Sequence, residues 1–165
     1  MPDIHSYQAR WNLNTTHTIE DASTSAVIMQ DPDAPNLTLI PLQATGLQVR
    51  AVSAQTTPEI LGWYIFKDRV PARAPATTVL HTVDGIGVQN LVTLLVPLQA
   101  GASLPISNIH RLAADSWNLQ FKDGRQFSVV IDVNPAGEIQ VSETRADGSP
   151  GRPIVVSPVQ SQMTR

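Results

Sequence analysis

The stretch of this sequence with the clearest chemical potential combines aromatic rings with cations. Its candidate binding residues are Trp63, Tyr64, Lys67, Arg69 and Arg73. Aromatic ring faces stack on sugars, and guanidinium groups hold carboxylate or sulfate in a planar fork. We therefore interpret this stretch as a candidate contact for an acidic polysaccharide. In the competing interpretation one ring faces the core and the other the rim, and the basic residues are simply solvated.

No complete active site accompanies this stretch. The chain has four histidines, far apart in sequence and in no metal-binding spacing, at positions 5, 17, 81 and 110. It has no cysteine, nucleophile elbow, phosphate loop or dinucleotide fingerprint. Acidic residues gather in turns, where Asp31, Asp33, Asp123 and Asp147 are best explained as turn formers. We predict no catalytic residue, no metal and no cofactor.

Net charge argues against nucleic acid as a partner, and the lack of a long apolar stretch argues against a membrane. Eleven basic and fourteen acidic residues give a net charge of −3, which offers no electrostatic footprint for nucleic acid. No apolar stretch approaches the ~18 to 20 residues of a membrane span. The N-terminus has neither the basic region nor the apolar core of a signal peptide. We expect the chain to be a piece of a longer protein.

The elements that must position any site are strands. Thirteen prolines and nine glycines punctuate short runs of Val, Ile, Leu and Thr, and no window has a helical apolar period. The pattern predicts an antiparallel β-sandwich of about ten strands, forming one domain over 1–157 with a flexible tail at 158–165. Predicted strands upstream of the last third cover 7–13, 26–29, 37–41, 47–53, 60–66, 77–83 and 88–96. The prolines of 31–35 and 70–75 mark loops or edge segments.

The last third predicts a three-strand meander. Apolar and polar residues alternate over 117–122 and 127–133, around a three-residue loop that needs Gly124 in the left-handed conformation. This register sets Leu119 opposite Phe127 and Trp117 opposite Val129, on one buried face. A second turn, built on Pro135 and Gly137, would set Val133 opposite Ile139 and Ile131 opposite Val141.

Three segments occur in an order that resembles a known family. They read SYQARWNL at 6–13, GWY at 62–64 and TLLVP at 93–97. Together they are similar to the C-terminal part of heparinase II/III-like polysaccharide lyases, over about residues 5 to 100. The family often has His in the middle of its Trp-x-Leu core, where this chain has Asn12.

The resemblance implies a sandwich packed behind an upstream α/α-toroid domain, in an exported bacterial enzyme that cleaves uronic-acid polysaccharides by β-elimination. It implies a periplasmic or extracellular location. The family's catalytic and zinc-binding residues would all precede residue 1, so none is carried over to this chain. The implied role is support of the toroid, and a contribution to the wall of the substrate cleft stays open. The alternatives are a free-standing carbohydrate-binding module and a structural β-sandwich module.

Overall fold

The protein is built from antiparallel β-sheets. The computed structural model describes residues 3–16, 18–21, 25–42, 46–65, 73–87, 89, 91–131 and 139–156, and within these ranges it contains strands and no helix. The all-β prediction is therefore confirmed. The chain separates into an N-terminal unit, Met1–Ser103, and a C-terminal unit, Leu104–Arg165, which are described one by one. The expectation of a single domain over 1–157 stays a prediction.

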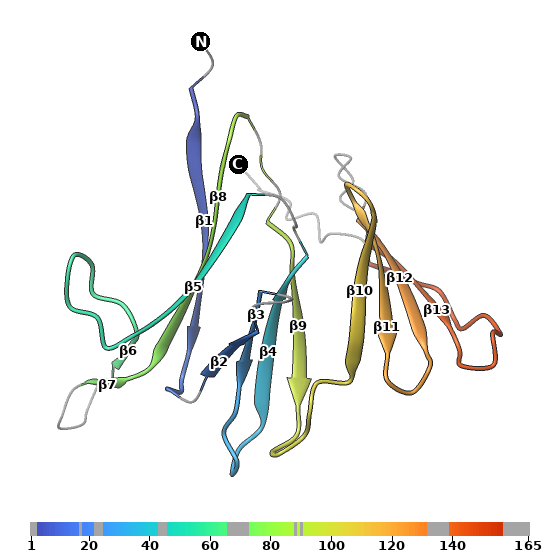
Figure 1. The fold of residues 1–165 in the computed structure, drawn as a ribbon, viewed down its shortest axis with the longest axis horizontal. Helices are drawn as coiled ribbons and strands as arrows, with labels where there is room; N and C mark the ends of the chain where they lie inside the picture. The colour runs from blue at the N-terminus through green and yellow to red at the C-terminus, as the bar shows by residue number, and fades with distance from the viewer. Residues whose placement is uncertain are drawn as a thin grey trace, which may run out of the picture. The chain divides into compact units, whose positions relative to one another are not determined.

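Two sheets make up most of the N-terminal unit (Figure 1). The three-stranded sheet has the order β1-β8-β5, with bounds β1 His5–Leu13, β8 Thr77–Gly85 and β5 Leu47–Ser53. The four-stranded sheet has the order β2-β3-β4-β9, with bounds β2 Thr18–Asp21, β3 Ala26–Met29, β4 Asn36–Pro41 and β9 Thr93–Leu98. Each sheet contains a pairing between strands that are distant in the sequence, β1 with β8 and β4 with β9.

The core of this unit lies between the two sheets. Leu13 and Val79 come from the three-stranded sheet, and Val27 and Leu39 from the four-stranded sheet, and the four side chains form one buried cluster. Val27, Leu39 and Val79 are 0% exposed. Because the cluster draws side chains from both layers, this unit is a β-sandwich.

Successive side chains of β1, β8 and β5 point alternately toward this core and away from it, so the three-stranded sheet also has an outer face. There Arg10 and Arg50 both pair with Leu80 of the central strand, one from each side. The residues around Leu80 are covered in part, since Leu80, Val52 and Leu61 form a second, smaller buried cluster. Leu61 belongs to the segment that follows β5, so this segment folds back over the outer face of the sheet.

A two-stranded hairpin follows that segment. It pairs β6, Trp63–Ile65, with β7, Arg73–Pro75, beside one end of the three-stranded sheet (Figure 1). Residues 55–61 are the segment that folds over the outer face of the three-stranded sheet, and we call them the covering segment. The strand predicted at 60–66 therefore begins later than expected, at Trp63. Of the proline-containing stretch 70–75, the described part, Arg73–Pro75, is an edge strand, as expected.

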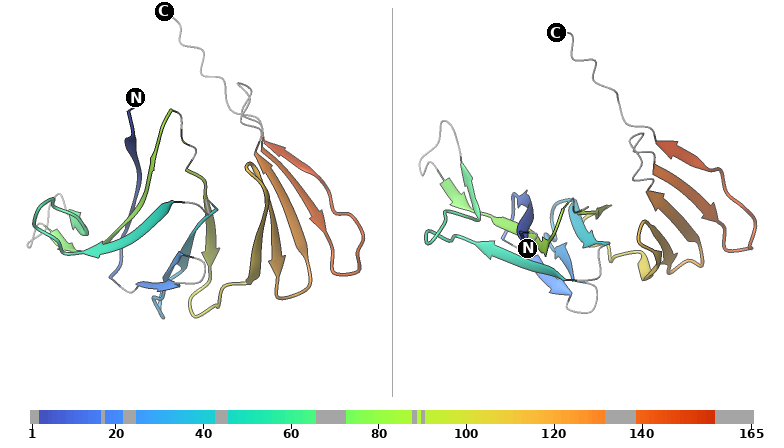
Figure 2. Two further views of the ribbon diagram at one scale, coloured as in Figure 1. Left: turned by 45° about the horizontal axis from the view of Figure 1, so that its top comes forward. Right: turned by 90° about the horizontal axis from the view of Figure 1, so that it is seen from above.

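The C-terminal unit is a single meander of five strands in sequence order, shown in brown to red in Figure 2. Its bounds are β10 Ile106–Ala113, β11 Ser116–Phe121, β12 Gln126–Ile131, β13 Ile139–Thr144 and β14 Ile154–Val156. Every strand pairs with its neighbours along the chain. The predicted meander is therefore present, and one further strand lies on each side of it.

The first predicted hairpin register is confirmed and the second is wrong. Leu119 pairs with Phe127, Trp117 pairs with Val129, and Gly124 has a φ of 88°. In the second hairpin, however, Ile131 pairs with Ile139 rather than with Val141. The observed pairing differs from the predicted one by two residues; the predicted turn residues Pro135 and Gly137, and Val133, lie outside the described residues. A two-residue shift keeps every side chain on its predicted face.

Two other expectations need correction. The stretch 88–96 was predicted as one strand, but the described part of it is strand only from Thr93 onward, and β9 runs through Pro97 to Leu98. The shared face of the meander is enclosed at Trp117 and Leu119, which are 3% and 4% exposed. Its other predicted members, Phe121, Phe127, Val129 and Ile131, are half-buried.

Candidate functional site

The β6–β7 hairpin brings together two of the five predicted binding residues. The guanidinium carbon of Arg73 lies 4.4 Å from the centre of the Trp63 ring. Arg73 pairs with Ile65 and is therefore diagonal to Trp63 on one face of the hairpin. At this distance the cation interacts favourably with the electron-rich ring face.

Tyr64 lies on the opposite face of the hairpin. It pairs with Ala74, whereas Trp63 pairs with Pro75, and neighbouring residues of a strand point to opposite faces. The Tyr64 side chain is 41% exposed and that of Ile65 is 76% exposed. The two aromatic rings therefore do not form one continuous surface. Lys67 and Arg69, the remaining predicted binding residues, lie outside the described residues.

Trp63 is held in place by the segment before it. Its indole N–H donates a hydrogen bond to the backbone oxygen of Gln55, at 2.9 Å. The same Gln55 is fixed by two backbone hydrogen bonds with Leu61, at 2.9 and 3.1 Å. The ring is thus half-buried and oriented through its polar edge, which leaves Arg73 over its face.

Gly62 connects this segment to the sandwich through three hydrogen bonds. Its N–H donates to the Thr78 hydroxyl of β8 at 2.9 Å, and its carbonyl accepts from the N–H groups of Ala54 and Ala76, at 3.0 and 2.9 Å. Its φ is 70°, and a Cβ at this position would collide with the backbone oxygen of Val52. Only glycine fits this crossing without a shift of the backbone.

Polar side chains of the outer sheet face anchor the same segment. Arg50 of β5 donates to the Gln55 amide oxygen at 2.6 Å, and the Gln55 amide nitrogen donates to the Glu59 backbone oxygen at 3.0 Å. Arg10 of β1 forms an ion pair with the Glu59 carboxylate at 3.0 Å. Sequence reasoning missed these residues, because only the pairing of β1 and β5 with β8 brings Arg10 and Arg50 to this segment.

His81 is a core residue and does not belong to the binding surface. It is 1% exposed on β8, and its Nδ1 lies 3.1 Å from the Thr93 hydroxyl of β9. Its Nε2 has no hydrogen-bond partner within the described part of the chain. Burial holds the pKa of His81 below its usual value. The ring is therefore kept neutral inside the sandwich.

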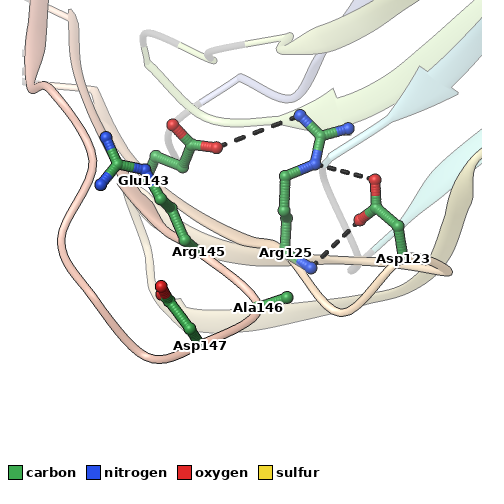
Figure 3. A pocket seen from close by; sticks show the side chains of 6 residues that line it. All are labelled: Asp123, Arg125, Glu143, Arg145, Ala146 and Asp147. Atoms are coloured by element: carbon green, nitrogen blue, oxygen red, sulfur yellow. Dashed lines mark hydrogen bonds and ion pairs between the residues drawn. The ribbon is translucent and has the colours of Figure 1, made fainter.

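A shallow hollow in the C-terminal unit is lined mainly by charged side chains, from two loops and from the end of β13 (Figure 3). Arg125 lies between two acids, with its Nε 2.8 Å from Asp123 and its Nη1 4.0 Å from Glu143. Hydrogen bonds from the backbone and side chain of Arg125 lower the pKa of Asp123. Hydrogen bonds from the side chain and backbone of Ser149 do the same for the pKa of Asp147.

Two acids of this hollow, Asp123 and Asp147, accept hydrogen bonds within their own turns. Asp123 accepts from the N–H of Arg125 at 3.1 Å, and Asp147 accepts from the N–H of Ser149 at 2.9 Å. The predicted turn-forming role of both aspartates is confirmed. Because these hydrogen bonds stabilise the carboxylate form, Asp123 and Asp147 are poor proton donors near neutral pH.

Comparison with known proteins does not assign a function to this chain. No family model, curated protein or solved structure matches this chain. Among the described residues, no group of three or more His, Asp or Glu side chains is arranged to hold a metal ion. The same residues contain no helix long and apolar enough to cross a membrane. The geometry of the β6–β7 hairpin and its anchors is therefore the main basis for a functional proposal.

Proposed function

We propose that this chain is a non-catalytic β-sandwich module that contacts an acidic polysaccharide through the β6–β7 hairpin. The observation that carries the proposal is the Arg73 guanidinium stacked on Trp63 beside an exposed strand. An aromatic ring and a planar cation at one position suit a sugar ring that bears a carboxylate or sulfate.

We further propose that the module serves a heparinase II/III-like polysaccharide lyase. The resemblance supplies this part of the proposal, together with the upstream α/α-toroid as partner and the periplasmic or extracellular location. Its three segments fall on β1, on the start of β6 and on β9, all within the N-terminal unit. In this proposal the chain supports the catalytic toroid and supplies no catalytic group, so the chain alone does not cleave polysaccharide.

An NMR titration tests the binding proposal. The probes are oligosaccharides of heparan sulfate, alginate and hyaluronan, with a neutral cello-oligosaccharide as control. We expect shifts at the Trp63 indole and at the amides of β6 and β7, with dissociation constants in the high micromolar to millimolar range, since so small a contact must offset the entropy of association. Binding weakens with added salt, because exposed charges are screened within ~8 Å at physiological ionic strength.

Variants identify the surface that binds. Trp63→Ala and Arg73→Gln should each weaken binding, whereas Arg111→Gln, which removes the same charge from the C-terminal unit, should not. Shifts clustered away from the hairpin, or none with any acidic probe at millimolar concentration, would contradict the proposal and favour a purely structural module. Absorbance near 232 nm, from the unsaturated uronate product, checks the expected lack of lyase activity.

A further inference from the structure

The ion pair between Arg10 and Glu59 has a geometry that a ligand carboxylate can reproduce. One terminal nitrogen of Arg10 lies 3.0 and 3.4 Å from the two Glu59 oxygens, while its Nε donates to the Gln8 side chain at 2.7 Å. The side chains of Arg10 and Glu59 are 47% and 56% exposed. Arg10 is therefore held in a defined direction on the sheet, and an external ligand has access to its carboxylate-binding end.

This contact is easily exchanged. A guanidinium binds a carboxylate best through two parallel N–H···O bonds from two nitrogens, and Glu59 meets only one of them. Exposed ion pairs contribute little to stability, since water screens them and two long side chains must be ordered. A second carboxylate can take the place of Glu59 without uncovering any buried charge.

The pair belongs to the same structural unit as Trp63. The Gln55 side chain donates to the backbone oxygen of Glu59, and the Gln55 backbone oxygen accepts the Trp63 indole N–H. Arg50, in the same row as Arg10, holds the other side of Gln55. Gln55 and Glu59 therefore link the Trp63 ring to Arg10 through an unbroken series of contacts.

We propose that Arg10 is a second carboxylate-binding position of the module, occupied by Glu59 while no ligand is bound. Its ligand is a uronate carboxylate of the acidic polysaccharide, and Glu59 occupies the position of that group in the ligand-free chain. The inference rests on the proposed function, and it names carboxylated sugars as the class that the site prefers.

Substitution of Glu59 gives the decisive test, with an alginate oligosaccharide, whose only anionic groups are carboxylates, as the probe. Glu59→Gln removes the competing carboxylate but keeps a side chain of similar shape. We expect the affinity to rise by up to about fivefold, the range in which exposed ion pairs contribute. The matched control is Glu143→Gln, which makes the same change in net charge on the C-terminal unit and should have a smaller effect.

Substitution of Arg10 gives the complementary test. Arg10→Gln should lower the affinity about threefold or more, and Arg10→Lys should restore part of it because the charge returns without the planar fork. Thermal unfolding of each variant checks that the fold is kept. The side-chain Nε–H signal of Arg10 should shift on titration in the wild-type protein.

The outcomes separate this inference from the function on which it rests. If Trp63→Ala and Arg73→Gln weaken binding but the Glu59 and Arg10 variants bind as the wild type does, the module function stands and Arg10 is not a binding position. If Glu59→Gln lowers the affinity, the ion pair only anchors the segment and the inference is wrong. If no acidic probe binds the wild-type chain, both proposals fall.

Discussion

The two units differ in which strands pair with one another. In the N-terminal unit, β1 pairs with β8 and β4 pairs with β9, so each sheet is closed by strands that are distant in the sequence. In the C-terminal unit every pairing joins consecutive strands. The first arrangement encloses Val27, Leu39 and Val79 completely, whereas the most enclosed side chains of the meander that we predicted, Trp117 and Leu119, keep 3% and 4% exposure.

This difference also decides where a composite site can arise. In the N-terminal unit, side chains from β1, β5 and the β6–β7 hairpin all make hydrogen bonds to the covering segment, at Gln55 or Glu59. In the described part of the C-terminal unit, the ion pairs of Arg125 join residues of one hairpin and of the strand next to it. Long-range pairing brings polar groups from distant parts of the chain together, whereas pairing of consecutive strands brings together only groups that are close in the sequence.

The largest expected effect comes from the closed core. Leu39→Ala should lower the free energy of unfolding by about 3 to 5 kcal/mol, because a cavity is left where no solvent reaches. Its control is Leu95→Ala, since Leu95 pairs directly with Leu39 but is 45% exposed, and should lose less than about 1.5 kcal/mol. Urea denaturation followed by circular dichroism measures both, and equal losses would contradict the enclosed core.

The next effect compares two glycines with left-handed conformations. Gly62→Ala should cost more than about 2 kcal/mol, because the backbone conformation is strained and the added Cβ also collides with the Val52 oxygen. Gly124→Ala should cost only about 1 to 2 kcal/mol, since its Cβ would meet the Ala146 methyl at 3.2 Å and no backbone oxygen. A smaller loss at Gly62 than at Gly124 would show that the covering segment is not fixed as described.

A smaller effect is expected on the apolar face of the meander. Phe127 packs against Phe121, with ring centres 5.1 Å apart, but its side chain is only half-buried. Phe127→Ala should therefore cost about 1.5 to 2.5 kcal/mol, roughly half of the loss at an enclosed phenylalanine. A loss of 4 kcal/mol or more in urea denaturation would mean that this face is as closed as the sandwich core.

The smallest effect is a difference in acid sensitivity. Since the pKa of His81 is lowered in the folded state, the unfolded chain binds the proton more readily. Stability from neutral His81 is therefore complete above about pH 6.5 and falls as the pH drops below that value. Asp123 and Asp147 also have lowered pKa values, but stability from them is lost only below about pH 3.9.

The measurement is the midpoint of thermal unfolding between pH 8 and pH 5. The wild-type midpoint should fall with pH, and His81→Gln should flatten that slope even if it lowers the midpoint throughout. An unchanged slope in His81→Gln would assign the acid sensitivity to other groups.

The sequence predicts local features of this fold well. Residues 26–29 and 47–53 were predicted as strands with the bounds that the structure has, and the Gly124 hairpin has its predicted register. The strand Ile106–Ala113 was missed because its apolar residues recur every third position, at 106, 109 and 112. Register shifts interrupt its pairing with β11, so it lacks the two-residue period on which strand prediction depends.

The candidate site was predictable only in part. Trp63 and Arg73 lie close in the sequence, and their residue types indicated both as candidates. The strand pairing that sets Arg73 diagonal to Trp63 was not predicted. Arg10 and Glu59 are far apart, and no local pattern indicates that β1 lies beside β8 rather than beside another strand. The register that joins them depends on the whole core, which periodicity alone does not specify.

The pairing of β1 with β8 also sets an order of events during synthesis. At roughly 5 to 20 residues per second, a ribosome needs several seconds after finishing β1 before β8 emerges. During that interval β1 is an unpaired strand, open to association with other nascent chains. The polar side chains of Gln8, Arg10 and Asn12 along one face then protect it from such association. The arginine assigned here to ligand binding would thus serve the chain before a binding site exists.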